Sequence, residues 1–514
     1  MRFAVVVEGD SIQAWEAACV DALVEAGCPI AGRASVGRRT SAARYGAPAS
    51  EKSVPLSPPV SGAAQIREGA RWPGGIDVAI AFDEPRAVRA LSLGAREAWA
   101  FSFGPPGDAA LPAGVGALAR CDGAFEASLV RITRDGRSAI KSGAFPVIAH
   151  SLAQTVDGAR FGAAAWPSRV AREEARGCEP ESRPVPQPDA SARPTPAPSA
   201  AVFALALAAR AAERRFGYLF RHEHWNIGIA ERPIESFLTD GTLHDVRWLP
   251  APPRGSFVAD PFGYAGAGTA YLLCEGFSYA DETGFLASGA IAEGPRATLA
   301  PFLRLPVHLS YPFVIADAGE VYCIPEMGRS GRVDLYRAVH LPDRWERVAT
   351  LLDGFGGIDP TVVRHDGRWW MFCTNPDAPN HELHAFHAQR LAGPWIAHAR
   401  NPVKVDVRSA RPAGTPFYAA GALHRPAQDC GGGYGRRVVI NRVDALTPTE
   451  FDERPVAFVE PDPAGPYRCG VHTLSSAGSH TLVDGKTYRF APAAFAATAR
   501  QYVRRLAGRR RAGD

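Results

Sequence analysis

The first part of the chain alternates short apolar runs with amphipathic segments, a pattern that predicts strands alternating with helices. The runs "FAVVV", "GIDVAIAFD" and "AWAFSFG" read as buried strands. Residues 10–27 carry apolar side chains at helical spacing, and we expect Asp10 or Ser11 to be the N-cap. A further pair of strands is predicted around the turn Asp135-Gly136. Alternating strands and helices favour an α/β domain with a parallel sheet.

The composition changes twice along the remaining chain. Residues 178–200 contain seven prolines and almost no large apolar residue, which is typical of an extended linker. A helical stretch follows that is too short and too rich in arginine to span a membrane, and after it short strands alternate with turns. The expected organisation is an α/β domain (1–177), a Pro-rich linker (178–200), a connecting helix (201–221), an all-β domain (222–492) and a basic C-terminal helix or tail (493–514).

The all-β part repeats itself about every fifty residues. Pro261, Pro312, Pro360 and Pro412 open successive units at spacings of 51, 48 and 52 residues, and a fifth unit is expected near His472. Each unit continues with a second strand, such as "AYLLCEG", "EVYCIPE" or "RWWMFCT", and several have a third. Four short strands per unit, repeated five times, predict a five-bladed β-propeller. A β-sandwich of similar length is the alternative, but it would not explain the period.

In a propeller the first strand of every blade lines the central channel, so the residues that open the units should meet there. These residues are Asp260, Tyr311, Asp359, Arg411 and His472. Three acids, Glu275, Glu326 and Asp429, end the following strands and are expected at the same mouth, and Arg425 and Gln428 are added as binding residues. A pocket with several carboxylates, an arginine and a histidine suits a hydroxyl-rich ligand.

Two carboxyl groups that flank a glycosidic bond can break or form it, one acting as acid and the other as base or nucleophile. We expect Asp260 to be the base, Glu326 the acid and Asp359 a residue that tunes or binds. Arg411 could bind a phosphate or carboxylate in a bidentate manner, and His472 could do the same or donate to a leaving oxygen. The competing interpretation is that Asp-Pro and Asp-Gly simply form the turns that blade openings need.

The composition gives limited information about the cellular location and the ligands of the protein. The 514 residues are 46% hydrophobic and 21% charged, with a net charge of +4, which gives no reason to expect nucleic-acid binding. The nine scattered cysteines and the acidic start of the chain favour a cytoplasmic protein without a signal peptide, disulfides or zinc. The three histidines of "HELHAFH" lie too far apart on a strand to hold a metal, and no cofactor is expected. The basic tail is a candidate for peripheral membrane contact.

Several segments between about residues 225 and 485 resemble the N-terminal domain of the plant glucosamine inositolphosphorylceramide transferases and its bacterial relatives. They include "HWNIGI", "FVADPFGY", "LSYPFV", "GIDPTVV", "ARPAG", "RPAQDC" and "GVHTLSS". That domain is similar to the five-bladed propeller of arabinanases and β-xylosidases. The resemblance implies that Asp260 is the base, that Asp359 tunes the pKa of its neighbours and that Glu326 is the acid. The glycosyltransferase region of the plant proteins has no counterpart here.

Residues 1–177 resemble the formyltransferase fold through "GIDVAIAFDEPRAVRALSLGAREAWAFSFG" and the following hairpin. The resemblance implies a catalytic histidine near "WAFSFGPPG", where the sequence has none, so we expect this domain to be inactive. For the whole chain we expect a carbohydrate-active enzyme of cell-envelope polysaccharide or glycolipid biosynthesis, with a carbohydrate, glycolipid or nucleotide sugar as its partner. The alternatives are a sugar-binding module without catalysis and a scaffold for other enzymes.

Overall fold

The computed structural model describes residues 1–8, 11–36, 48–56, 58–61, 63–66, 72, 75–105, 108, 111–178, 183–184, 196–266, 269–291 and 298–490. The chain forms two compact units, Met1–Ala209 and Arg210–Asp514. The predicted linker falls mostly outside the described residues, and the predicted basic tail falls entirely outside them. The predicted connecting helix is present as α7 (Ala200–Phe220), within which one unit ends and the other begins. Among the described helices, none has the length and apolar character needed to cross a bilayer.

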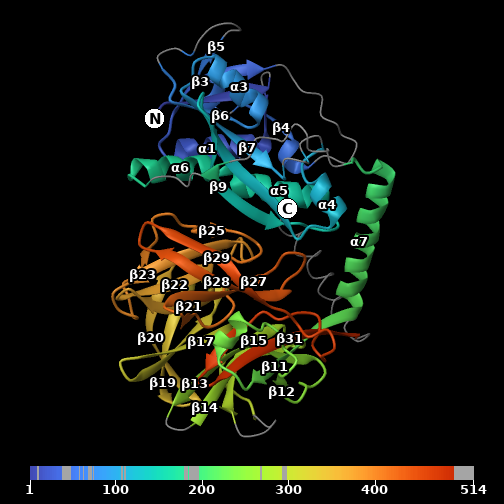
Figure 1. Ribbon diagram of the computed structural model, residues 1–514, viewed down its shortest axis with the longest axis vertical. Helices are drawn as coiled ribbons and strands as arrows, with labels where there is room; N and C mark the ends of the chain where they lie inside the picture. Colours follow the sequence, from blue (N-terminus) through green and yellow to red (C-terminus); the bar gives the residue numbers. More distant parts are fainter. Residues whose placement is uncertain are drawn as a thin grey trace, which may run out of the picture. The chain divides into compact units, whose positions relative to one another are not determined.

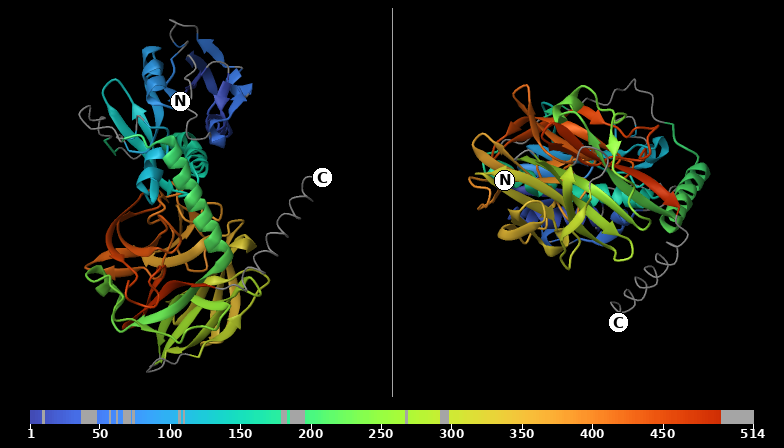
Figure 2. Two further views of the ribbon diagram at one scale, coloured as in Figure 1. Left: turned by 90° about the vertical axis from the view of Figure 1, so that its right-hand side faces the viewer. Right: turned by 90° about the horizontal axis from the view of Figure 1, so that it is seen from below.

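The N-terminal unit is built on a mixed sheet with helices on both faces (Figures 1 and 2). Its described strands are β1 (Phe3–Glu8), β2 (Ser11–Gln13), β3 (Ile30–Val36), β4 (Ser53–Pro55), β5 (Ala64–Ile66), β6 (Val78–Ala81), β7 (Glu97–Phe103), β8 (Ala124–Ile132), β9 (Arg137–Pro146) and β10 (Arg183–Pro184). Its described helices before α7 are α1 (Ala14–Glu25), α2 (Pro58–Ser61), α3 (Glu84–Ser92), α4 (Val115–Arg120), α5 (Leu152–Ala164) and α6 (Trp166–Ala175), with a 3-10 turn η2 (Ala49–Glu51).

The sheet of this unit is parallel only in its centre. Strands β1, β3, β5, β6 and β7 are parallel neighbours, whereas β8 and β9 form the predicted antiparallel hairpin. Alternate residues of the central strands face opposite sides, so that α3 packs on one face and Trp15 of α1 packs against aromatic residues on the other. The alternation of strands and helices therefore predicted this α/β unit correctly.

The start of the first helix was predicted wrongly. Residues 11–13 form strand β2, which pairs with β4, and α1 begins only at Ala14. The N-cap is Gln13, whose backbone N–H donates to the side chain of Glu16 at 3.0 Å. The helical spacing of residues 12–23 is real, but residues 12 and 13 pair with strand β4 instead of joining the helix.

The C-terminal unit is a five-bladed β-propeller (Figure 1). The first four blades follow one another along the chain. Blade one is β13 (Ser256–Gly266), β14 (Thr269–Ser278), β15 (Thr283–Ile291) and β16 (Ala300–Leu303), and blade two is β17 (Ser310–Asp317), β18 (Glu320–Glu326), β19 (Arg332–His340) and β20 (Arg344–Asp353). Blade three is β21 (Ile358–His365), β22 (Arg368–Thr374), β23 (Glu382–Ala388) and β24 (Ile396–Ala397), with β25 (Lys404–Val405) beside β23, and blade four is β26 (Phe417–Ala419), β27 (Ala422–Asp429), β28 (Arg437–Leu446) and β29 (Phe451–Val459). Two 3-10 turns accompany them, η4 (Ile234–Leu238) and η5 (Gly328–Ser330).

The fifth blade joins the two ends of the propeller. Its inner strands, β30 (Leu474–Ala477) and β31 (His480–Phe490), come from the C-terminal side, and its outer strands, β11 (Arg221–Ala230) and β12 (Arg247–Trp248), precede the first blade. Strands β11 and β31 pair antiparallel along their whole length, the green and red neighbours of Figure 1. This closure ties the ring together, and it brings the opening of the fifth unit beside the first.

The same irregularity opens the first three blades. The register between the first and second strand shifts at Asp260, Tyr311 and Asp359, each of which precedes a proline. These residues have positive φ angles of 50°, 45° and 51°. A positive φ is unfavourable for residues with a β-carbon and is concentrated at functional sites. The repeated X-Pro thus marks a bulge that turns one side chain of each blade into the channel.

Candidate active site

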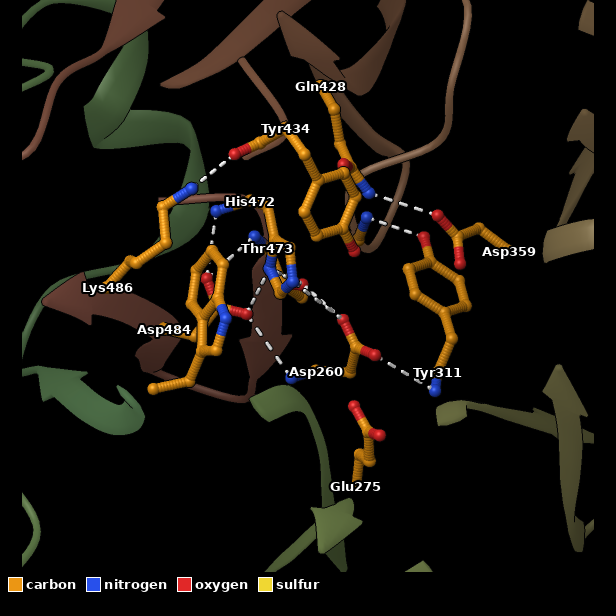
Figure 3. Close-up of polar contacts among 12 residues, drawn as sticks. Asp260, Glu275, Tyr311, Asp359, Gln428, Tyr434, His472, Thr473, Asp484 and Lys486 are labelled. Atoms are coloured by element: carbon orange, nitrogen blue, oxygen red, sulfur yellow. Dashed lines mark hydrogen bonds and ion pairs between the residues drawn. The ribbon is translucent and has the colours of Figure 1, made fainter. Parts of the chain in front are cut away.

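The residues that open the blades meet at one mouth of the channel, as the sequence predicted (Figure 3). Tyr311 links three of the blades. Its backbone N–H donates to Asp260 Oδ2 at 3.2 Å, while its hydroxyl lies 2.8 Å from Thr361 Oγ1 and accepts from the N–H of Gly414 at 2.7 Å. The Tyr311 side chain is fully buried, so it packs the channel below the acids. All of these bonds are to other residues of the protein, so the substrate contact predicted for Tyr311 stays a prediction.

Asp260 is buried and hydrogen-bonded on both carboxylate oxygens. Besides the bond from Tyr311, its Oδ1 accepts from Thr473 Oγ1 at 3.0 Å, and His472 Nε2 lies 3.8 Å from the same oxygen. Burial raises the pKa of Asp260 to about 6, a rise that the His472 cation limits and that the negative charges of Asp359 and Asp484 increase. The carboxyl group is therefore largely ionised at neutral pH and remains basic enough to accept a proton.

His472 lies between two carboxylates. Its Nδ1 is 2.5 Å from Asp484 Oδ2, and its ring stacks on Trp225 with centroids 4.0 Å apart. Burial by itself would lower the pKa of His472, but Asp484 and then Asp260 raise it above its ordinary value. The imidazole is thus held as a cation beside Asp260.

Asp359 belongs to a second group on the other side of the mouth. Its Oδ2 accepts from Arg411 Nε at 2.6 Å and from Gln428 Nε2 at 3.0 Å. Arg411 Nη2 lies 3.9 Å from Glu326, which brings the predicted acid next to Asp359. Burial raises the pKa of Asp359 to about 7; Arg411 opposes this rise, and the charge and hydrogen bond of Glu326 increase it. Asp359 therefore exchanges its proton near neutral pH, with Glu326 close by.

The guanidinium group of Arg411 is ion-paired with Asp359 and lies near Glu326. Its Nε and Nη2 both donate to Asp359, Nη1 donates to Asn380 Oδ1 at 3.3 Å, and its guanidinium lies 5.0 Å from the centre of the Tyr434 ring. The predicted role of binding a phosphate or carboxylate would require this ion pair to open. The side chain is better suited to holding Asp359 and Glu326 in place.

Glu275 adds a third carboxyl group next to Asp260. It lies opposite Ala259 in the pairing of β13 and β14, and its carboxyl group points toward Asp260 (Figure 3). His308 Nε2 lies 3.4 Å from Glu275 Oε1, and His308 Nδ1 accepts from the N–H of Gly284 at 2.9 Å. Burial and then the charges of Asp260 and Glu326 raise the pKa of Glu275 well above its ordinary value. Glu275 therefore binds a proton more readily than an exposed glutamate does.

Two predicted binding residues make their contacts elsewhere. Arg425 forms a buried ion pair with Glu453 at 2.5 Å and donates to the carbonyl of Ser409. Asp429 accepts from the N–H of Gly431 and from Arg437 Nε at 2.8 Å. These contacts serve the packing of the fourth blade. Glu275, Tyr311, Gln428 and His472 do lie in the cluster; the ligand contacts predicted for them stay predictions.

Sequence reasoning missed the residues that hold His472. Asp484 lies in strand β31, but the surrounding sequence "VDGK" is typical of a turn, so the sequence did not indicate Asp484 as a site residue. Thr473 follows a predicted site residue directly, and Trp225 stands in the quoted segment "HWNIGI" as one aromatic among many. Only the closure of the fifth blade, which brings β11 and β31 to the first blade, reveals their position.

Asp260, His472 and Asp484 each have one potential metal-ligand atom, a carboxylate oxygen or a ring nitrogen, and these three atoms lie within 4.8 Å of one another. Both oxygens of Asp484 already accept N–H donors: Oδ1 from the backbone of His472 and Thr473, and Oδ2 from the backbone of Asp260. We therefore interpret Asp484 and His472 as a hydrogen-bonded pair beside Asp260, whose Oδ1 lies 3.8 Å from His472 Nε2, and assign no metal to these side chains.

Comparisons with known proteins found similarity to a part of the propeller. Residues 249–467 match the family model "Glucosamine inositolphosphorylceramide transferase 1, N-terminal". The matched segment contains the first four blades with Asp260, Glu326 and Asp359; it leaves out the N-terminal unit, whose likeness to formyltransferases stays a prediction.

The curated relatives are plant proteins of the same name. The chain is 35% identical to glucosamine inositolphosphorylceramide transferase 1 of Oryza sativa subsp. japonica over 211 residues, which cover 39% of this chain and 28% of the rice protein. It is 34% identical to the Arabidopsis thaliana protein over 213 residues, covering 40% and 28%. The chain thus spans less than a third of the length of these relatives.

Solved structures with a similar fold are glycoside hydrolases. They include Zg3597, a family 117 glycoside hydrolase of Zobellia galactanivorans, with a TM-score of 0.35, 12% identity and coverage of 52% of this chain and 91% of that one. The alpha-L-arabinanase of Cellvibrio cellulosa in complex with arabinohexaose has a TM-score of 0.30, 15% identity and coverage of 38% and 77%. The assignment of a propeller rests on the five sheets described above.

Proposed function

We propose that the propeller is a carbohydrate-active enzyme that forms or breaks a glycosidic bond. The observation that carries this proposal is a buried cluster in which two separate carboxyl groups face different partners. Asp260 lies beside His472 on one side, and Asp359 is ion-paired with Arg411 next to Glu326 on the other. Chemistry at a glycosidic bond requires such a pair, one group to accept a proton and one to donate it.

In the proposed reaction Asp260 accepts the proton of the attacking hydroxyl group, which belongs to water or to a sugar acceptor. Glu326 donates a proton to the leaving oxygen, and Asp359 keeps that proton available by sharing it at a pKa of about 7. Arg411 holds both acids in place. Glu275, a buried hydrogen-bond donor, binds a hydroxyl group of the sugar. Asp260 then releases its proton and Glu326 takes one up from solvent, so both acids return to their starting forms.

The names of the relatives support a substrate that is a carbohydrate or a glycolipid, and we propose a nucleotide sugar as donor in the cytoplasm, in the synthesis of envelope polysaccharide or glycolipid. The N-terminal unit would then be an inactive α/β domain, with the linker and connecting helix as assigned from the sequence.

The test is mass spectrometry of the full chain incubated with a panel of nucleotide sugars and simple glycosides. We compare the wild type with Asp260→Asn and with Asp317→Asn, a matched loss of one charge at the far end of β17. Release or transfer of a sugar that is lost only in Asp260→Asn supports the proposal and identifies the donor. Saturable binding without turnover would instead leave a sugar-binding module, and neither turnover nor binding would favour a scaffold.

A further inference from the structure

The mouth contains a side chain that touches no predicted substrate position and yet joins the fifth blade to the first. Asp484 in β31 is fully buried and accepts from four donors: the backbone N–H groups of His472, Thr473 and Asp260, at 2.9, 3.1 and 3.2 Å, and His472 Nδ1 at 2.5 Å. A buried carboxylate needs such donors, because an unpaired charge in the interior is costly. Its position is therefore set by the backbone of two blades.

These bonds orient the imidazole ring of His472. With Nδ1–H donated to Asp484, Nε2 is left to face Asp260, whose Oδ1 lies 3.8 Å away. Figure 3 shows the ring of His472 between the carboxyl groups of Asp484 and Asp260. Trp225 stacks on the ring at an interplanar angle of 16° and prevents it from tilting. In an arrangement of this kind the first acid orients the imidazole and stabilises its cationic form beside the second acid.

We propose that Asp484 is a positioning residue that acts through His472: it fixes the orientation of the ring and keeps it cationic, so that Asp260 stays ionised and ready to accept a proton. This proposal rests on the function proposed for Asp260. Without Asp484, the ring would turn neutral and Asp260 would lose the cation that faces it.

The other charged groups around His472 agree with this assignment. The groups that face it are Asp484 from β31, Asp260 from β13, Asp359 from β21, the phenol of Tyr434 after β27, and Lys486, whose ammonium lies 5.1 Å from the centre of the Trp225 ring. Lys486 also donates to the carbonyl oxygen of Tyr434. Three of these groups are acids, and Asp484 is the one in direct hydrogen-bond contact with the ring. Burial by itself would raise the pKa of Asp484, but His472 and the backbone donors hold it below its ordinary value.

Asparagine at position 484 is the informative replacement. Its carbonyl oxygen can still accept the backbone N–H groups of His472 and Thr473, but its NH₂ group donates where Oδ2 accepted. His472 Nδ1 must then become an acceptor, which requires a neutral ring. Asp334→Asn is the matched control, because Asp334 is a fully buried acid in the second blade that accepts from Arg347 and Thr350, each at 2.8 Å.

The experiment is an NMR titration of the full chain labelled with ¹³C and ¹⁵N in histidine, in which His472→Gln identifies the signal of His472. We expect both ring nitrogens of His472 to be protonated at pH 7 in the wild type and in Asp334→Asn. In Asp484→Asn the pKa of His472 should fall by at least about one unit, as expected when a contacting carboxylate is lost. A neutral His472 in the wild type, or an unchanged titration in Asp484→Asn, would overturn the proposal.

Two further readouts keep the result decisive. If Asp484→Asn does not fold, the wild-type titration alone decides whether the ring is cationic. Where the sugar panel yields turnover, Asp484→Asn should move the acid limb of the pH profile to higher pH, because Asp260 loses its cation, whereas Asp334→Asn should leave it in place. A panel without turnover refutes the proposed function only, since the titration of His472 is measured without substrate; an unmoved acid limb refutes the positioning role.

Discussion

Replacing Asp260 by asparagine should remove a fall in the propeller's free energy of unfolding that the wild type shows as the pH rises from about 4 to 6. The folded pKa of Asp260 is about 6 and its ordinary value is 3.8. Because the folded value is higher, the contribution to stability is fully present below pH 3.8 and is lost as the pH rises through 6. A difference of about 2 pKa units corresponds to about 3 kcal/mol of free energy of unfolding. Asp260→Asn carries no charge to lose, so this part of the pH dependence should disappear.

The substitution also has a cost that does not depend on pH. The NH₂ group of asparagine would meet either the N–H of Tyr311 or the hydroxyl of Thr473, and losing one buried hydrogen bond costs about 1–3 kcal/mol. His472 keeps Asp484, its nearest acid, and stays charged. The quantity to compare is therefore the change with pH of the difference in unfolding free energy between variant and wild type, because the constant cost cancels in that change.

Urea unfolding between pH 4.5 and 7.5 measures this difference. Pulse labelling with deuterium, read by mass spectrometry on peptides from β13 and β31, reports on the propeller separately from the N-terminal unit. The free energy of unfolding of Asp260→Asn should gain about 2 kcal/mol on the wild type across this range. Asp317→Asn, which removes one charge at the far end of β17, should follow the wild type. Parallel curves for Asp260→Asn and the wild type would refute the reasoning, because Asp260 would then titrate at its ordinary value.

Three further predictions concern the surroundings of the mouth. Gly284→Ala should lower the free energy of unfolding by about 1–3 kcal/mol in urea melts, because its Cβ would lie 2.8 Å from Glu275 Oε1, while Gly433→Ala, with no atom within 4 Å, should be neutral. Arg425→Ala should lower the free energy of unfolding by about 1–3 kcal/mol in the same assay, because Glu453 keeps Lys404 at 2.8 Å but loses its guanidinium partner, and an unchanged stability would contradict this. If turnover is found, its pH profile should be a narrow bell between pH 6 and 7, and Asp359→Asn should remove the bell's alkaline limb.

The repeat could be predicted from the sequence because it depends on short, local sequence features. The X-Pro pairs at Asp260, Tyr311 and Asp359 recur at the blade period, and each is the bulge that turns a side chain into the channel. The same reasoning failed where a long-range partner decided the outcome, as for residues 11–13, which form a strand instead of the first turn of a helix. Arg425 shows the other failure: its strand was predicted, but its side chain pairs with Glu453 inside the fourth blade.

The sequence by itself determined the α/β unit, the five-bladed propeller and the set of acids that open its blades, because strand alternation, turn residues and a fifty-residue period are local properties of the chain. Only the tertiary structure decided which charges face one another. Asp260 and Asp484 are 224 residues apart and meet because β11 pairs with β31 and closes the ring. Arg411 goes to Asp359 and Glu326 and not to a free site for the same reason: the pairing of buried charges depends on distances across blades, which no local pattern encodes.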